Sequence, residues 1–256
     1  MRERALALSG PRALLMQAAH PLAVSGLLAH SEALDDPYVR LARTAEVLNT
    51  VTFGSRSAAD QVTRRVRALH RAVRGRLPTA VGIYPAGTPY SADDPRLLMW
   101  ILYSLVDSAA VVYRTYVGGL DRAQRSALWD DYKIVGRLFG LTLDAMPSTV
   151  DDLDEYGRRM LTGPELHVGG WARRRARKIV LQPPVPTLAR PVLETVNFIT
   201  IALLPDRIRS EYGFPPLPPA AVRKALVGAG ALYVRRGLLP VLPSHIREVP
   251  AARRAA

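Results

Sequence analysis

Apolar residues recur along this chain with the period of an α-helix, and proline and glycine divide that pattern into short segments. No run alternates apolar and polar residues as a half-buried strand would, and no repeat of fixed length is present. The chain has 256 residues, 48% of them hydrophobic, which is enough to bury one substantial core. We therefore predict an all-α fold, a single-domain bundle of about ten helices over residues 1–247, with a disordered basic tail at 248–256.

Capping residues and helix breakers set the expected boundaries. Pro21 should interrupt the first helix, because proline lacks the amide donor that a helix interior needs. Residues 78–89 hold repeated prolines and glycines, so no regular structure is expected there. A short helical turn is expected at 205–212. The longer helices are expected at residues 11–30, 37–53, 58–77, 95–117, 122–139, 150–161, 163–181, 188–203 and 219–236.

Composition excludes several kinds of site. The chain has no cysteine, which rules out disulfides, thiolate zinc sites, iron–sulfur clusters and a cysteine nucleophile. The net charge of +13 could favour nucleic acid, anionic lipid or an acidic partner. Because no helix-turn-helix signature or aromatic–basic interleaving accompanies it, we expect no nucleic-acid partner. A basic helical module without a cofactor remains the alternative to an enzyme.

Two stretches bear on membranes. The charged start, MRERALALSG, is too short for the apolar core of a signal peptide, and we expect a cytoplasmic protein. Residues 97–117 are the most apolar long stretch, but they contain Asp107 and Arg114, which favours a buried core helix over a membrane span. The basic amphipathic residues 171–180 could make a peripheral contact with anionic lipid; a solvated helix face is the alternative.

The helix expected at 58–77 places a histidine beside an apolar stripe. At 100° per residue, His70 lies roughly 50–60° from the middle of that stripe, at its edge. From there its imidazole could reach a cavity, with the second ring nitrogen oriented by a carbonyl or carboxylate. The alternative is an ordinary core-edge histidine with a satisfied hydrogen bond. The stripe consists of Val62, Val66, Leu69, Val73 and Leu77.

The preceding helix carries a polar group among valines. Arg40, Thr44, Val47 and Val51 share one side of it, and Arg43 flanks that side. An arginine there suits a propionate or carboxylate, and a threonine can hydrogen-bond a bound oxygen species. A solvated arginine face with an ordinary threonine is the alternative.

Two further histidines lie on the first helical segment. His20 directly precedes the interruption at Pro21, where freed backbone carbonyls often form a cavity wall. His30 lies at an expected helix end, where a cationic imidazole would complement the helix dipole.

Five segments in this order resemble a known family. GPRALLMQAAHPLAVSGLLAHS, DPYVRLARTAEVLNTVTFGS and RVRALHRAVRG are followed by WILYSLVDSAAVVYRTYVGGL and YKIVGRLFGLTLDAMPST, and the resemblance covers roughly residues 9–165. Together they resemble the DUF2236 family, which includes the MpaB-type oxygenases and the rubber-cleaving latex clearing proteins. The order and context of the segments carry the resemblance, which no single segment would do alone.

The resemblance implies a helical fold enclosing a pocket for b-type haem. It implies that His70 is the proximal iron ligand and that Arg40 and Thr44 line the distal side. Arg43 stands where the latex clearing relatives carry a lysine, and a guanidinium that stays protonated is a poor reversible ligand. Those relatives also use a distal glutamate as a base. The matching stretch of this chain has none, and His20 is its only comparable acid–base group.

The long apolar helix offers two more candidates for the cofactor cavity. Trp100 could line it, with core packing as the alternative. Asp107 lies among apolar residues and needs a partner, which an arginine or the distal imidazole could provide. We therefore expect a haem b-dependent oxygenase or oxidase that uses dioxygen or peroxide on a small or lipid-like apolar substrate. A non-catalytic haem sensor or carrier is the alternative.

Overall fold

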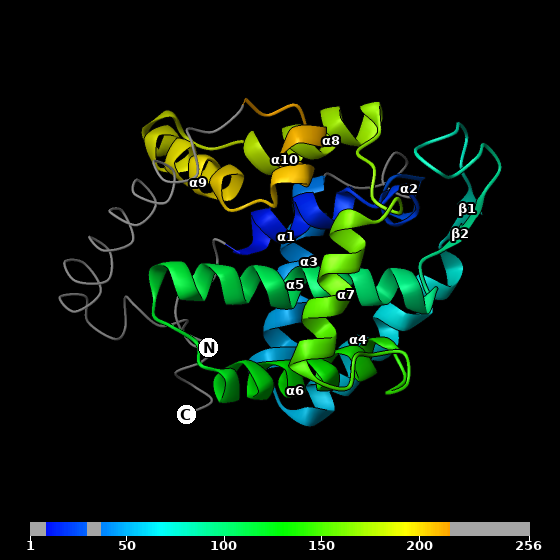
Figure 1. Ribbon diagram of the computed structural model, residues 1–256, viewed down its shortest axis with the longest axis vertical. Helices are drawn as coiled ribbons and strands as arrows, with labels where there is room; N and C mark the ends of the chain where they lie inside the picture. Colours follow the sequence, from blue (N-terminus) through cyan, green and yellow to red (C-terminus); the bar gives the residue numbers. More distant parts are fainter. Residues whose placement is uncertain (1–8, 30–36, 216–256) are drawn as a thin grey trace.

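The computed structural model describes residues 9–29 and 37–215, and within these ranges ten α-helices surround one main core (Figure 1). The all-α prediction is confirmed, and the described residues contain one small sheet, a two-stranded hairpin. The hairpin consists of β1 (Arg74–Arg76) and β2 (Pro89–Ser91), and a 3-10 turn covers Thr187–Ala189. The helices are α1 (Ser9–Ala18), α2 (Pro21–Ala29), α3 (Pro37–Phe53), α4 (Arg56–Ala72), α5 (Pro95–Tyr116), α6 (Arg122–Phe139), α7 (Val150–Thr162), α8 (Gly170–Leu181), α9 (Arg190–Ala202) and α10 (Asp206–Glu211).

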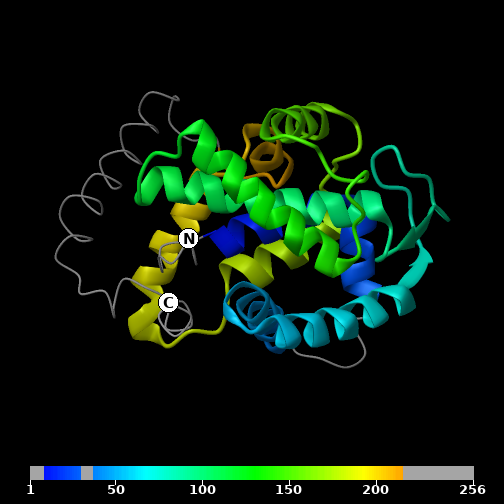
Figure 2. The same cartoon turned by 90° about the horizontal axis from the view of Figure 1, so that it is seen from below.

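Helix α5 runs through the middle of the molecule, and the other helices are arranged around it. α1 and α6 pack along α5, α8 and α9 pack on α1, and α4 packs on α6. Figures 1 and 2 show α7 and the α3–α4 pair on opposite sides of α5. α7 and the α3–α4 pair therefore lie on different sides of the central helix, and α6 contacts both α4 and α7.

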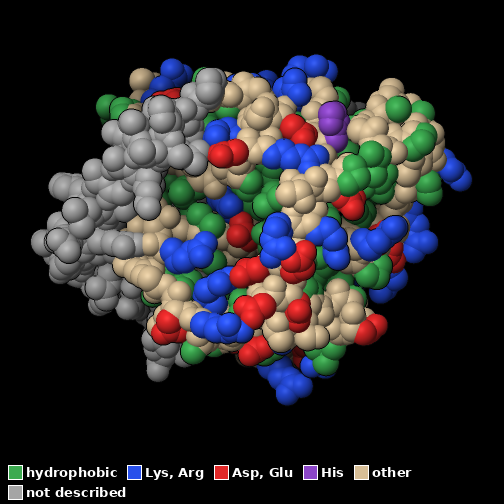
Figure 3. All heavy atoms as spheres, in the orientation of Figure 1, with side chains coloured by type: hydrophobic (Ala, Val, Ile, Leu, Met, Phe, Trp, Pro, Cys, Tyr) green, Lys and Arg blue, Asp and Glu red, His purple; other side chains and the backbone are tan. Residues whose placement is uncertain are grey.

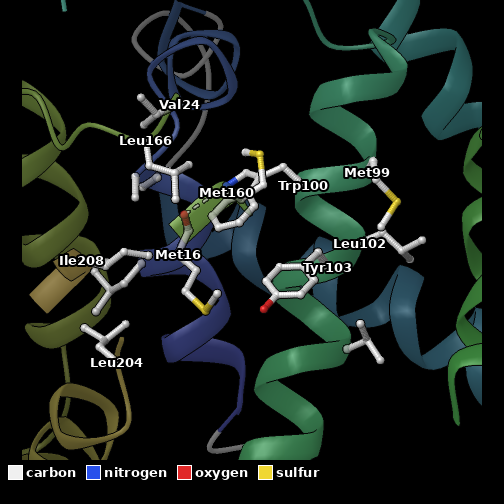
Figure 4. Close-up of a cluster of buried hydrophobic side chains, with 14 of the residues drawn as sticks. Met16, Val24, Met99, Trp100, Leu102, Tyr103, Met160, Leu166, Leu204 and Ile208 are labelled. Carbon is white, nitrogen blue, oxygen red and sulfur yellow. Dashed lines mark hydrogen bonds between the residues drawn. The ribbon is translucent and has the colours of Figure 1, made fainter. Parts of the chain in front are cut away.

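The apolar character of α5 serves the core. By length and composition it could cross a membrane, yet 56% of its most apolar window is buried inside the protein. Trp100 and Tyr103 stack with ring centroids 5.7 Å apart and lie in the main cluster of buried side chains (Figure 4). The prediction of a buried core helix is confirmed.

Capping explains why several expected boundaries are correct. The Asp94 carboxylate accepts the amide of Arg96 at the start of α5. Asp121 and Thr149 each form a capping box at the starts of α6 and α7, which satisfies amides that lack helical partners. Gly140, with a φ of 107°, ends α6 in the left-handed region that disfavours other residues.

The break at Pro21 occurs as expected. α1 ends at Ala18, and α2 begins at Pro21 itself, which takes the first helical position where its missing amide costs little. His20 therefore lies in the bend between two helices.

The hairpin, the end of α4 and the start of α8 differ from the sequence predictions. α4 ends at Ala72 instead of continuing to residue 77, and the chain becomes extended at Val73. Gly75 then pairs with Tyr90 in the hairpin, and a Cβ at position 75 would overlap the Tyr90 hydroxyl group. α8 begins at Gly170, because residues 163–169 form a loop rich in glycine and proline. His30, the helix expected at 219–236 and the tail at 248–256 lie outside the described residues.

Candidate functional site

The two helices that carry the predicted cofactor residues pack against each other. Gly54 separates α3 from α4, and the Ser55 hydroxyl group accepts the Ala58 amide at 3.2 Å, which caps α4 as expected. Because the connection is short, the two helices become neighbours in space. The motif Arg40-x-x-Arg43-Thr44 and His70 thus belong to adjacent helices.

His70 lies on the face of α4 that is turned toward the protein interior. The fully buried residues of this helix are Ala59 and Thr63. At 100° per residue, His70 projects within about 20° of each of them. The side chain is half-buried, and its Nδ1 atom is shielded from solvent.

The apolar stripe of α4 is only partly covered. Leu69 is 65% exposed, and Val62 and Val66 are half-buried. The stripe that the sequence placed toward the core is therefore rotated by roughly 60° toward solvent. This rotation moves His70 from the edge of the inward face to its middle and leaves apolar surface open beside it.

The predicted residues of α3 lie on a largely exposed helix. Arg43 and Thr44 are exposed, and Val47 and Val51, farther along the helix, are half-buried. Arg40 lies in α3, one helical turn before Thr44, and its side chain is outside the described part of the structure.

His20 is buried at the bend between α1 and α2. Its Nδ1 atom accepts the Leu22 amide at 3.3 Å, which assigns the proton of the neutral ring to Nε2. Nε2 lies 3.5 Å from the hydroxyl oxygen of Tyr84, a residue of the loop between β1 and β2. Burial lowers the pKa of His20 from 6.5 to about 4, so the imidazole is neutral at physiological pH.

The two candidates on α5 have defined surroundings. Trp100 is fully buried in the core, and its indole nitrogen donates to the Met16 carbonyl oxygen at 3.2 Å. Asp107 has the arginine partner that its position required, since Arg12 Nη1 lies 2.8 Å from its carboxylate. Arg12 is buried and also donates to Ser108 Oγ and to the carbonyl oxygen of Leu203.

The sequence did not reveal the residues that contact His20 and Asp107. Tyr84 was hidden in a loop rich in glycine and proline, and only the hairpin brings it to His20. Arg12 could have been suspected from the sequence, because a charged residue stands between apolar neighbours in the first turn of a helix.

Comparison with known proteins places this chain in a family. A family model described as "ER-bound oxygenase mpaB/B'/Rubber oxygenase, catalytic domain" matches residues 1–236. The chain belongs to this family. The resemblance inferred from the five segments is confirmed, and membership assigns the chain to a class of oxygenase catalytic domains, that is, of enzymes.

Two mycobacterial relatives are also similar to this chain. They are "Uncharacterized protein Mb2261" of Mycobacterium bovis and "Uncharacterized protein Rv2237" of Mycobacterium tuberculosis, each 27% identical over 182 residues. The matched region covers 68% of this chain and 65% of each relative, so the chain spans just under two thirds of their length. No solved structure matches the chain significantly.

A metal ion and a haem need different sets of ligands from a protein. No group of three or more histidine, aspartate or glutamate side chains gathers in residues 9–29 and 37–215. A haem brings its own four nitrogen ligands and needs only one from the protein. His70, inward-facing and beside uncovered apolar surface, can supply that ligand.

Proposed function

We propose that this chain is a haem-dependent oxygenase acting on a small or lipid-like apolar substrate with dioxygen or peroxide, and that His70 ligates the iron. The observation that carries the proposal is the family match over residues 1–236, which names an oxygenase catalytic domain. The position of His70 among the buried residues of α4 supports it, because a ligand must face inward to hold a cofactor against the protein.

The surroundings of His70 support a large, flat, mostly apolar cofactor. Leu69, Val62 and Val66 present apolar surface that the protein leaves partly open. Covering such surface stabilises a complex by about 25 cal/mol per Å² removed from water. When bound, haem supplies the activation of dioxygen or peroxide, a reaction that no protein side chain performs alone.

The residues of α3 would bind the cofactor and orient its oxygen ligand or the substrate. Arg40 and Thr44 are four residues apart and therefore share one face of the helix. A guanidinium group of Arg40 or Arg43 can pair with a propionate carboxylate, and the Thr44 hydroxyl group can donate a hydrogen bond to an oxygen ligand or substrate. The exposure of Arg43 and Thr44 leaves both side chains accessible for these contacts.

His20 would keep its proton on Nε2, and its low pKa makes it a poor general base. Efficient general bases have pKa values near the working pH, and the pKa of His20 is about 4. Its Nε2 proton faces the Tyr84 oxygen across a partly buried contact of 3.5 Å. In this proposal His20 fixes the orientation of the Tyr84 hydroxyl group.

The test is haem reconstitution of the full-length chain, followed by visible spectroscopy. Wild type should show a Soret band that is lost or shifted in His70→Ala and recovered when free imidazole is added. His167→Ala is the matched control, because His167 is an exposed histidine in the loop before α8 and should leave the band unchanged.

Two results would overturn the proposal at different points. A wild-type protein that takes up no haem would exclude both the oxygenase and the alternative haem carrier. A Soret band unchanged in His70→Ala would exclude His70 as the ligand. If haem binds, oxygen or peroxide consumption with candidate apolar substrates separates the enzyme from a carrier, which would bind haem without turnover.

A further inference from the structure

A pocket of about 180 Å³ opens between α5, α6 and α7. It lies on the α7 side of α5, whereas the α3–α4 pair lies on the other side (Figure 2). Neither His70 nor any residue of α3 lines it. Part of its wall is aliphatic, from Val106, Leu128 and Leu153, and several polar groups face the same space.

The inner end of this pocket carries a hydroxyl group that makes no hydrogen bond within the described residues. Tyr103 is only 7% exposed, and its ring is held between Trp100 and Tyr156. Its hydroxyl group reaches α7 beside Gly157, where a Cβ atom would overlap it. Burial raises the pKa of Tyr103, so the group stays protonated and can donate. The hydroxyl oxygen is still reachable by solvent, and a ligand oxygen could replace water as its acceptor.

Both carboxylates that line the pocket are paired with arginines, and one further arginine has no carboxylate partner among the described residues. Asp107 is paired with Arg12 at 2.8 Å, and Asp154 is paired with Arg125 at 2.6 Å. Arg114 lies at the exposed end of the pocket and makes no ion pair among the described residues. Acidic and basic side chains intermingle on the face around α6 and α7 (Figure 3), so an anion would be drawn to this local excess and not to a broad positive patch.

Size and spacing define the kind of ligand. The volume corresponds to about six water molecules at roughly 30 Å³ each. Tyr103 and Arg114 are eleven residues apart on α5, about 16 Å along the helix axis, and share one face. A ligand that serves both must therefore be elongated, with an oxygen function at each end and an aliphatic middle.

We propose that this pocket binds a short aliphatic monocarboxylate that carries a second oxygen function at its other end. The carboxylate pairs with Arg114 at the mouth, the chain lies along Val106 and Leu128, and the far oxygen accepts from the Tyr103 hydroxyl group. The site is separate from the α3–α4 pair and does not depend on the haem proposal.

The test is isothermal titration of the purified full-length chain with 6-hydroxyhexanoate, hexanoate and n-hexylamine. The hydroxy acid should bind more tightly than hexanoate, and the amine should not bind. Arg114→Gln should weaken both acids by about tenfold, whereas Tyr103→Phe should weaken only the hydroxy acid, by about fivefold. Arg137→Gln is the matched control, because Arg137 is an exposed arginine on α6 outside the pocket.

Circular dichroism of each variant separates loss of a contact from loss of the fold. Three outcomes would overturn the proposal: no saturable heat from either acid with wild type, binding of hexylamine as tight as that of the acids, or equal effects of Arg114→Gln and Arg137→Gln. An equal loss of both acids in Tyr103→Phe would refute the role of the hydroxyl group. Because no step requires haem, these results stand apart from the spectroscopic test of His70.

Discussion

The buried imidazole of His20 should make the stability of this protein depend on pH in a defined window. In the folded state its pKa is about 4, whereas the ordinary value is 6.5, and the cause is burial. Below pH 6.5 the unfolded chain therefore binds a proton that the folded chain does not. Stability is fully present above pH 6.5 and is lost as the pH falls toward 4.

The size of this effect follows from the two pKa values. Each pH unit between them corresponds to about 1.4 kcal/mol. Relative to pH 7.5, His20 should reduce the free energy of unfolding by about 1.3 kcal/mol at pH 5.5 and by about 2.5 kcal/mol at pH 4.5. Because His20 is only 5% exposed, solvent should screen little of this difference.

Urea denaturation of wild type and His20→Asn at several pH values isolates the contribution. The asparagine oxygen can still accept the Leu22 amide, so the bend between α1 and α2 keeps its hydrogen bond. The variant should lose stability less steeply between pH 7.5 and 4.5, while His167→Asn, at an exposed histidine, should follow wild type. Identical pH dependence in wild type and His20→Asn would refute the reasoning.

Two further substitutions test an ion pair and a close backbone contact. Arg12→Met should reduce the free energy of unfolding by about 3 kcal/mol, because it leaves Asp107 without its buried partner. Adding Asp107→Asn should recover part of that loss in thermal or urea melts. Gly75→Ala should destabilise the protein by about 1–3 kcal/mol, since the new methyl group overlaps Tyr90; an effect no larger than that of Gly119→Ala, where the Cβ meets open space, would contradict this.

Local chemistry made much of the helical architecture predictable. Asp94, Asp121 and Thr149 satisfy the first amides of their helices, and Gly140 adopts a conformation that other residues disfavour. These interactions involve neighbours in sequence, so the sequence alone contains them. The hairpin was missed because its two three-residue strands pair across an intervening loop, and neither shows an alternating pattern by itself.

The candidate site likewise has features that the sequence predicts and features that depend on packing. The residue pattern already indicates that His70 and the motif Arg40-x-x-Arg43-Thr44 lie on successive helices, that the family segments occur in order, and that Asp107 needs a partner. Each of these depends on helical period or on the order of residues.

The surroundings of those residues depend on how the helices pack. Packing rotates α4 so that His70, and not Leu69, faces inward, and the bend before Pro21 buries His20 and lowers its pKa. It also joins Arg12 to Asp107, 95 residues apart, and places Tyr103 in the wall of a pocket. The burial of a side chain and the charges near it depend on residues distant in sequence. Helical periodicity could therefore place these side chains on a helix but could not predict their neighbours.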